Sequence, residues 1–378
     1  MSSKYFDNAA TTRVDQDVRA IIDRYNTEEF FNPSANYRLS VEVHNRITEA
    51  RESILRCLKG QNGTIYFTSS GTEADNQAVF CSKKRKNSNV VISSVEHPAV
   101  YNSANALKNM GYEVRICPVD GCGRVDFAAF CSLVDKNTSF ISVMHVNNET
   151  GAINDIAKLV KAAKKINPSV VFHSDGVQAF GKIPVNLAEL DVDLYTVSGH
   201  KIGAPKGIAA LYVKKGVTVS PLLYGGGQEN GMRSSTENVS GIMAFAYAAA
   251  RATAELPANR QNYLSFIEEL RGALAPVEEI KYISDEGCSS HIFTFAFKTV
   301  RGEVMQHALE VSDILVGTGS ACSARRSHDR IPAALGLKEY ADGVIRVSFG
   351  RENTMDEVRE LGAELLKNYE ILKKYVGK

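Results

Sequence analysis

Between residues 64 and 213, short apolar runs of strand length alternate with segments of helical pattern. Several of the runs are hydrophobic nearly throughout, as expected of strands covered on both faces of a sheet. The runs occupy residues 64–69, 89–94, 112–117, 139–146, 170–175, 193–198 and 207–213. This alternation predicts an α/β fold in which a mostly parallel central sheet is flanked by helices.

Three amphipathic patterns predict individual helices, at residues 39–58, 155–166 and 354–372. The last of them opens with Thr354 and Glu357, whose spacing is that of a capping box. We therefore expect helices that each bury one apolar face against the sheets.

After about residue 255 the alternation gives way to two strand patterns, at 291–297 and 343–349, with helices between and after them. This change predicts a second, smaller α+β domain that also includes the N-terminal segment. We place the large domain at residues 13–255 and the small domain at residues 1–12 and 256–378.

The composition restricts the possible functions. The 378-residue chain has 44 Lys and Arg against 43 Asp and Glu, so it lacks the basic field of a protein that binds nucleic acid or a membrane surface. The chain begins without the apolar core of a signal peptide, and its most apolar stretch, 242–250, is too short to span a bilayer. The seven cysteines include no CxxC pair, which favours reduced thiols over disulfides or a zinc site. We therefore expect a soluble cytoplasmic enzyme without a metal.

Polar clusters follow the ends of several predicted strands. They occupy residues 68–73, 96–98, 147–151, 173–178 and 198–201. Because ligands of open α/β sheets collect at the carboxyl ends of the strands, the five clusters predict one shared site.

Three of these clusters contain residues suited to an aldehyde cofactor with a phosphate. Lys201 follows a strand directly, and lysine forms Schiff bases with carbonyl groups, although an isolated loop lysine is usually just solvated. Asp175 ends an apolar strand and needs a positive partner, which a protonated pyridine nitrogen would supply; a structural hydrogen bond is the alternative. The turn before residue 71 leads into a helix whose N-terminus would bind an anion, or would simply be capped.

Further motifs extend these clusters over nearly the whole chain. They read DNAATT (7–12), NPS (32–34), SSGTEADN (69–76), EHPAV (96–100), MHVNNETG (144–151), SDGVQ (174–178), SGHK (198–201), GGGQENGMRSSTEN (225–238), TGSACS (318–323) and IRVSFGR (345–351). In order and spacing this set resembles the pyridoxal-phosphate (PLP) cysteine desulfurases of the NifS/IscS type, in the class V aminotransferase family. The resemblance implies the PLP fold type I.

The resemblance also implies roles at the cofactor ring. Lys201 would bind PLP covalently as a Schiff base and later move the α-proton of the substrate. Asp175 would keep the pyridine nitrogen protonated, so that the ring accepts electrons. Gln178 would bond the ring hydroxyl, and His97 would stack on the ring and act as an acid and base.

Other positions would bind the phosphate of the cofactor. By resemblance these are Gly71, Thr72, Ser198 and His200, with Thr236 reaching in from the second subunit of a homodimer.

Three residues would bind the substrate. Asn148, which would also contact the cofactor, and Arg346 would hold the carboxylate of L-cysteine, with Asn32 as a further substrate-binding residue. For Arg346, a guanidinium–carboxylate pair gives the physical reason.

Cys322 lies in a run of small residues, 317–324. Without context, such a cysteine is more often an inert surface residue than a nucleophile. In the resembling family it is the nucleophile of a mobile loop, here about 317–330, and its thiolate takes the sulfur of the bound cysteine as a persulfide. The TGSAC form, without a preceding His-rich motif, indicates the longer-loop class that passes sulfur directly to several acceptors.

Several positions depart from the family pattern. They are Tyr37, Ser40, Gly203, Ala204, Ser235, Arg325 and Arg326. None of them removes a catalytic group, so they bear on the acceptor and the rate rather than on the reaction. The arginine pair after Cys322 would lower the cysteine pKa, bind an acidic partner, or form a solvated basic turn.

The leading hypothesis is a cysteine desulfurase that converts L-cysteine to L-alanine and loads sulfur on Cys322. The acceptor would be an iron–sulfur scaffold, a tRNA-thiolating sulfurtransferase or a cofactor-biosynthesis protein. The alternatives are a selenocysteine lyase, a transaminase-like relative of the same fold, or an inactive scaffold homologue. Retention of Lys201, His97, Asp175 and Cys322 together argues against the scaffold.

Overall fold

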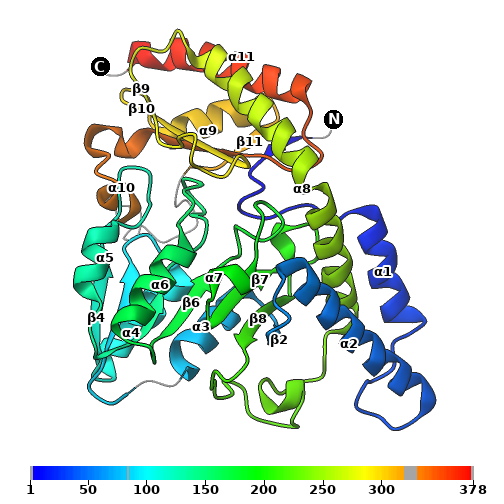
Figure 1. Ribbon diagram of the computed structural model, residues 1–378. Coiled ribbons are helices and arrows are strands. Elements are labelled where there is room, and N and C mark those ends of the chain that lie inside the picture. The colour runs from blue at the N-terminus through cyan, green and yellow to red at the C-terminus, as the bar shows by residue number, and fades with distance from the viewer. Residues whose placement is uncertain (1–2, 83–84, 319–329, 376–378) are drawn as a thin grey trace.

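The computed structural model describes residues 3–82, 85–318 and 330–375, which form a larger part around one sheet and a smaller part above it (Figure 1). The larger sheet has seven strands in the order β2-β8-β7-β6-β5-β3-β4. Their bounds are β2 (Gly63–Thr68), β8 (Ala209–Lys214), β7 (Leu194–Ser198), β6 (Val171–Asp175), β5 (Thr138–Ser142), β3 (Asn89–Ser93) and β4 (Glu113–Cys117). Only β8 runs antiparallel to its neighbours in this sheet. The predicted α/β class, with its mostly parallel sheet, is confirmed.

Helices cover both faces of this sheet, which explains why its central strands are apolar throughout. Successive residues of β3 point to opposite faces: Val91 packs in one core cluster, and Val90 and Ile92 pack in another. The first cluster takes residues from α2 (Arg38–Leu58), α5 (Phe127–Leu133), α6 (Ile156–Ile166), α7 (Leu187–Leu190) and α8 (Val239–Leu274). The second takes residues from α3 (Gly71–Cys81) and α4 (Pro98–Asn109).

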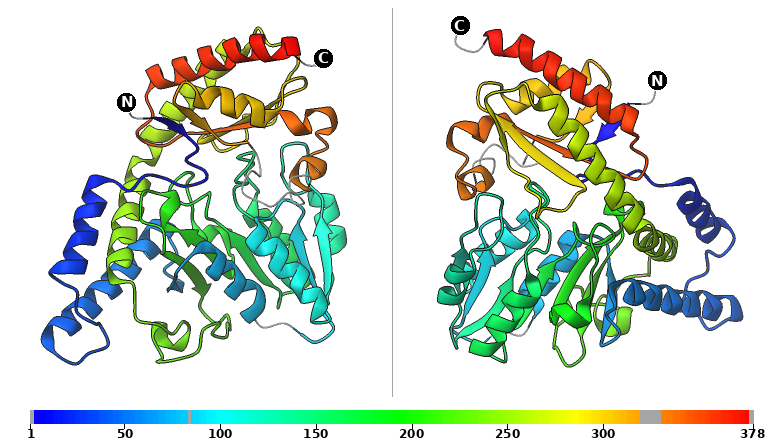
Figure 2. Two further views of the ribbon diagram at one scale, coloured as in Figure 1. Left: turned by 180° about the vertical axis from the view of Figure 1, so that it is seen from behind. Right: turned by 45° about the horizontal axis from the view of Figure 1, so that its top comes forward.

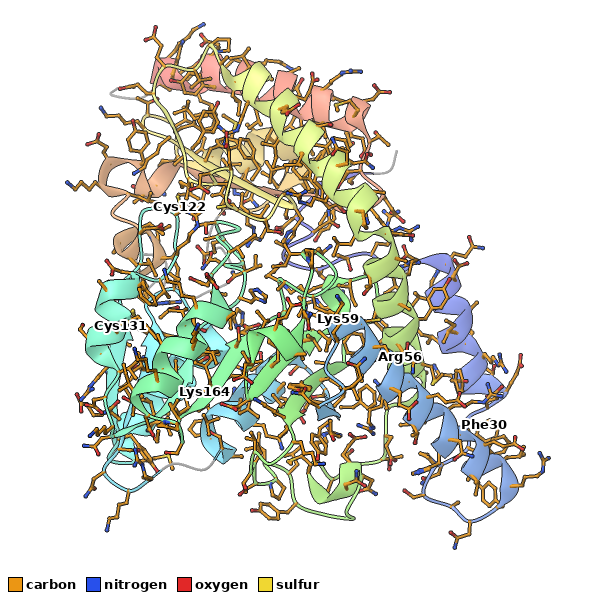
Figure 3. The ribbon with its side chains drawn as sticks, viewed as in Figure 1. Phe30, Arg56, Lys59, Cys122, Cys131 and Lys164 are labelled. Atoms are coloured by element: carbon orange, nitrogen blue, oxygen red, sulfur yellow. The ribbon has the colours of Figure 1, made fainter. Side chains whose placement is uncertain are left out.

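The N-terminal helices extend away from the sheet. Both α1 (Gln16–Thr27) and α2 pack against α8, and the loop between them projects from the body of the molecule in all three views (Figures 1 and 2). Figure 3 shows Phe30 at this projecting end.

The smaller part is built on a three-stranded antiparallel sheet of β12 (Val344–Ser348), β10 (Ile292–Phe297) and β9 (Ile280–Tyr282). Its core is rich in aromatic rings, among them Phe6, Phe293 and Phe349. The helices of this part are α9 (Gly302–Glu310), α10 (Arg330–Ala334) and α11 (Met355–Leu372).

The N-terminal strand lies in this smaller part. Strand β1 (Lys4–Phe6) pairs in parallel with β11 (Ile314–Val316), about three hundred residues along the chain. Residues 7–12 then cross from the smaller part to the larger sheet, where Thr12 donates its backbone N–H to His200 O.

A single helix joins the two parts. The 36-residue α8 begins against the large sheet, contains Pro257, and ends against α11 (Figure 1). The domain boundary that we predict after residue 255 falls inside this helix. Although α8 is long, no helix within the described ranges has an apolar stretch long enough to cross a membrane.

The capping box at α11 provides a test of how local sequence stabilises the smaller part. Thr354 Oγ1 accepts the Glu357 N–H at 3.3 Å, and Glu357 Oε2 accepts the Thr354 N–H at 3.1 Å. We expect Thr354→Ala to lower the free energy of unfolding by about 1 kcal/mol, because the Glu357 N–H in the first turn loses its acceptor. Thr354→Ser keeps the hydroxyl and should be close to wild type. Equal losses in the two variants, measured by urea unfolding, would contradict this role.

Candidate active site

The predicted polar clusters meet at one edge of the large sheet. Strand β6 ends at Asp175 and β7 ends at Ser198, which a short 3-10 turn carrying Lys201 follows. His97 lies after β3 and caps α4, while α3 begins after β2. Because these strands run parallel to one another, their carboxyl ends bring the side chains together, as predicted.

Lys201 is held by backbone from the N-terminal segment. Its Nζ donates to Ala9 O at 2.7 Å and to Ala10 O at 2.8 Å. The segment is fixed in turn by Thr12, whose Oγ1 donates to His200 O and accepts the Gly203 N–H at 2.8 Å. This explains the DNAATT motif, to which the sequence analysis gave no role: it supplies carbonyl acceptors for the lysine.

Asp175 is the negative pole of the site. Its carboxylate is buried and accepts the Val177 N–H at 2.9 Å. Burial raises the pKa of Asp175 to about 6, while the charge of Lys201 opposes that rise. The group is therefore mostly ionised at neutral pH and needs a positive partner.

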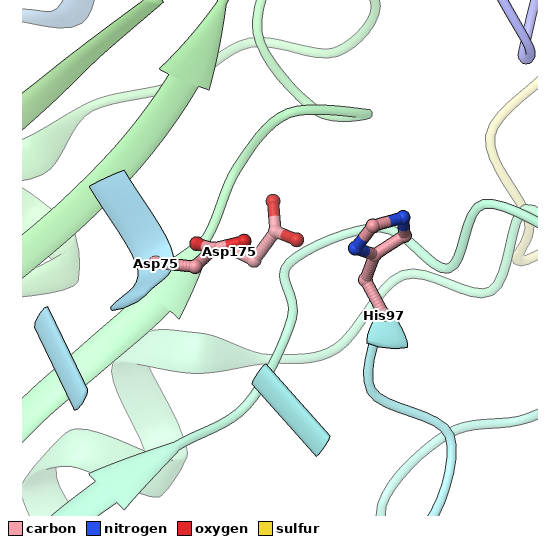
Figure 4. Close-up of side chains that lie close together, drawn as sticks. All are labelled: Asp75, His97 and Asp175. Carbon is pink, nitrogen blue, oxygen red and sulfur yellow. The ribbon is translucent and has the colours of Figure 1, made fainter. Parts of the chain in front are cut away.

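His97 faces Asp175 across the site (Figure 4). Burial, together with the charges of Lys201 and Arg330, lowers the pKa of His97 to about 4. Its Nδ1 accepts the Ala99 N–H at 3.2 Å at the start of α4. The imidazole is therefore neutral at pH 7 and carries its proton on Nε2.

Two further acids lie beside Asp175. Asp75 on α3 and Glu96 before α4 are both buried. Burial raises the pKa of Asp75 well above its usual value, and the charge of Asp175 raises it again. Burial likewise raises the pKa of Glu96 to about 8. Both acids therefore stay protonated at neutral pH, which leaves Asp175 as the ionised member. Neither acid has a predicted role; the signal for Asp75 is a charged residue in the helix segment that has to pack against the sheet.

The donor atoms of Asp75, His97 and Asp175 lie within 4.8 Å of one another, a spacing that would also suit a metal ion. Carboxyl groups must lose their protons to bind a metal, and the raised pKa of Asp75 opposes that loss. A protonated ring nitrogen requires only Asp175 to be ionised. The charges at this site thus fit a cationic ring better than a metal.

An anion fits the other end of the site. The backbone N–H groups at the start of α3 point out of the helix beside Gly71, while Ser70 caps Glu73 N. A Cβ atom on Gly71 would lie 3.7 Å from the Ser198 Cβ, so the two positions adjoin. Ser198 Oγ is buried and has no hydrogen-bond partner within the described part of the chain. An unpaired hydroxyl next to a helix N-terminus suits a phosphate, as predicted for PLP.

His200 adjoins this end and is held by the N-terminal segment. Its Nδ1 lies 3.2 Å from Thr11 Oγ1. Burial lowers the pKa of His200 to about 4, so it would offer a neutral N–H to an anion rather than a charge.

Arg346 lies on β12, on the side of the smaller part. Its guanidinium donates to Asp7 Oδ1 at 2.7 Å and to Asn148 O at 2.8 Å. Its Nε is buried and unpaired among the residues that the structure describes. Arg346 therefore keeps one donor for a substrate carboxylate, and Asn148 adjoins it through the backbone. The partner Asp7 was not predicted.

Two predicted residues lie apart from this group in a single chain. Asn32 is exposed in the projecting α1–α2 loop, where its Oδ1 accepts the Ser34 N–H. Thr236 is exposed in the loop before α8. Arg233 in the same loop forms an ion pair with Glu73 of α3, with 2.9 Å between Nε and Oε1. Cys322, with Arg325 and Arg326, lies outside the described residues.

The other departures from the family pattern lie outside the group of charged residues. Gly203 has φ of +91°, which favours glycine, and Ala204 is buried against Gly199. Tyr37 and Ser235 are exposed, whereas Ser40 is buried in α2.

The raised pKa of Glu96 gives a pH test. From about pH 4.5 to 8 the unfolded chain loses the Glu96 proton while the folded chain keeps it, so stability falls as pH rises through this range. In Glu96→Gln, which keeps the oxygen that accepts Met144 N–H, this loss should vanish. For the cofactor-free proteins, we expect the melting temperature of Glu96→Gln minus that of wild type to increase steadily from pH 5 to pH 8. The exposed Glu303→Gln serves as control, and parallel pH profiles for Glu96→Gln and wild type would refute the assignment.

Comparisons with known proteins agree with this geometry. The aminotransferase class-V family model matches residues 4–361. A cysteine desulfurase IscS of Methanosarcina thermophila is 35% identical over 94% of this chain and 89% of its own length. A solved NifS-like protein superposes with a TM-score of 0.90 at 32% identity, over 98% of this chain and all of that one. The solved SspA, in complex with cysteine, gives a TM-score of 0.78 at 27% identity, over 92% of this chain and 99% of that one.

The family model covers both parts of the fold. The alignments with the desulfurase relative and with the NifS-like structure cover almost the full length of those proteins. Enzymes of this family use PLP, held as a Schiff base on a lysine. The aldehyde-binding lysine, the ionised aspartate and the anion pocket described above fit that cofactor. The chain therefore belongs to the aminotransferase class-V family, in its group of PLP-dependent cysteine desulfurases of the NifS and IscS type.

Proposed function

We propose that this enzyme takes the sulfur from L-cysteine, releases L-alanine, and places the sulfur on Cys322 for delivery to an acceptor protein. The observation that carries the proposal is the meeting of Lys201, His97 and Asp175 in one site of a desulfurase-like fold. The complex of the related SspA with cysteine supports the choice of substrate.

The cofactor, when bound, supplies an electron sink for the carbon that loses a proton. Asp175 would hold the proton on the ring nitrogen, because it is the ionised acid of the buried group. Lys201, whose Nζ donates to Ala9 O and Ala10 O, would hold the aldehyde and then carry the substrate proton. His97 is neutral and can both give and take a proton at Nε2.

Substrate orientation would come from the smaller part. The unpaired Nε of Arg346 is the donor for the cysteine carboxylate, and the ion pair with Asp7 keeps the guanidinium plane in place. Asn148 would complete this subsite.

Sulfur transfer needs a second nucleophile. The Cys322 thiolate would attack the substrate sulfur, forming a sulfur–sulfur bond while the carbon–sulfur bond breaks. The carbon keeps the electron pair of the broken bond and takes a proton, which gives alanine, and Cys322 is left as a persulfide. No external oxidant is needed, because the carbon that keeps the electron pair is reduced as the transferred sulfur is oxidised to the persulfide level.

Delivery of the sulfur would serve iron–sulfur assembly or tRNA and cofactor thiolation in the cytoplasm. The names of the IscS relatives favour the first of these. None of the six cysteines in the described residues is in a disulfide, which suits a reducing compartment.

The direct test is to supply L-cysteine and measure alanine and sulfide. Equal amounts of both products are expected in the presence of a reductant. A selenocysteine lyase would act on selenocysteine and leave cysteine, a transaminase would form a keto acid, and an inactive scaffold would form nothing. Any of those outcomes would contradict the proposal.

Cys322→Ala separates sulfur transfer from cofactor binding. We expect this variant to bind PLP with the absorbance of wild type, yet to release less than about 1% of the wild-type alanine, because only the thiol is lost. Cys131→Ala, on α5 at the edge of the molecule (Figure 3), is the matched control and should keep full activity. Normal turnover by Cys322→Ala would show that another thiol receives the sulfur.

A homodimer would bring Asn32 and Thr236, both exposed in one chain, to the sites of the neighbour. Mixed dimers of Lys201→Ala and Thr236→Asp chains then contain one intact site, with Lys201 from one chain and Thr236 from the other. Co-expression should restore about a quarter of wild-type activity, because about half of the dimers are mixed and each has one of two sites. Each variant alone should be nearly inactive. A fully active monomer by light scattering, or no recovery on co-expression, would disprove shared sites.

A further inference from the structure

Three buried side chains form a hydrogen-bonded chain behind the cofactor site. Ser289 Oγ lies 2.7 Å from His291 Nδ1, and His291 Nε2 lies 3.2 Å from Gln178 Oε1. Gln178 Nε2 then donates to Ala9 O at 2.8 Å. Their exposed fractions are 2%, 1% and 4%, so no bulk water replaces these contacts.

The direction of every bond in this chain is fixed by one end. A backbone carbonyl only accepts, so the Gln178 group that faces Ala9 O must be the amide nitrogen. Its amide oxygen therefore faces His291, whose Nε2 must carry the proton. The His291 Nδ1 is then an acceptor for the Ser289 hydroxyl.

The surroundings keep His291 in this neutral form. Burial lowers its pKa well below the usual value, and the charges of Lys182, Arg346 and Lys201 lower it further. The imidazole therefore does not gain a second proton near neutral pH, and its only N–H is the one that Gln178 requires.

We propose that His291 is a positioning residue that acts through Gln178. His291 holds the amide oxygen of Gln178 away from the cofactor. The second N–H of Gln178 Nε2 can then donate to the ring hydroxyl oxygen. The inference rests on the proposed role of Gln178 at PLP and adds a residue to which the sequence analysis gave no part.

The energetic reason is the charge on that ring oxygen. In the correct orientation the Gln178 amide donates an N–H to the ring oxygen. A flipped amide would instead place its own carbonyl oxygen against the ring oxygen and repel it. An amide anchored only by Ala9 O would also share that carbonyl with Lys201 Nζ, which moves during the reaction. His291 gives the amide a second anchor that does not depend on the lysine.

The test uses two substitutions at one position. His291→Met removes the donor, whereas His291→Gln offers an amide N–H at about the place of Nε2. With the PLP-loaded enzyme and no substrate, we expect His291→Met to raise the pKa of the bound chromophore by about one unit and to weaken PLP binding about tenfold. His291→Gln should restore both to within about twofold. If His291→Met does not fold, His291→Asn, which is too short to reach Gln178, replaces it.

A double-variant cycle with Gln178→Leu distinguishes positioning from general stability. Once Gln178 is gone, His291→Met should not change the chromophore pKa further, although each substitution changes it alone. Unchanged spectra in His291→Met, equal effects of His291→Met with and without Gln178, or no effect of Gln178→Leu would each overturn the proposal. These readouts require no cysteine turnover, so a failed desulfurase assay does not decide them.

Discussion

The site depends on a strap of six residues, 7–12, that lies between the two sheets. On one side the strap contacts two residues of β12. Asp7 pairs with Arg346, and the Ala9 N–H donates to Ser348 Oγ at 2.9 Å. On the other side the Ala9 and Ala10 carbonyls bind Lys201. The substrate-binding arginine and the cofactor lysine are thus placed by the same short piece of backbone, and each depends on the other part of the fold for its position.

The electrostatics of the pocket follow from burial more than from pairing. Three acids, Asp75, Glu96 and Asp175, lie out of contact with bulk water, and burial raises the pKa of each. Lys201 opposes this rise at Asp175 and Arg330 opposes it at Glu96, yet the pKa of Glu96 still reaches about 8, whereas that of Asp175 reaches about 6. The result is one ionised carboxylate where the family chemistry requires one, with protonated neighbours that carry no charge to compete for the ring nitrogen.

Much of the fold is visible in the sequence because its signals are local. All seven strands of the large sheet fall on strand-length runs of the sequence, several of them apolar on both faces, and the Thr354–Glu357 capping box marks the start of α11 within one residue. The motifs likewise indicate Lys201, Asp175 and His97. The family resemblance, rather than periodicity, provides their roles.

The features that escaped prediction depend on contacts between distant residues. The three-residue β1 pairs with β11, and Asp7 meets Arg346 across 339 residues, and neither leaves a periodic signal. Asp75, Glu96 and His291 read as ordinary polar residues until the fold buries them. Similarly, α8 continues past the predicted boundary because its apolar face changes partner, from the large sheet to α11.

The placement of the strap also sets an order on folding. Its residues are made before those of the large sheet, yet their partners in β12 are made after it. The large sheet can form during synthesis, because its strands follow one another closely along the chain. The Ala9 and Ala10 carbonyls that accept from Lys201, however, are not held in place until β12 has been made. A nascent chain therefore carries its cofactor lysine before it has a finished pocket, and cofactor capture is coupled to the synthesis of β12.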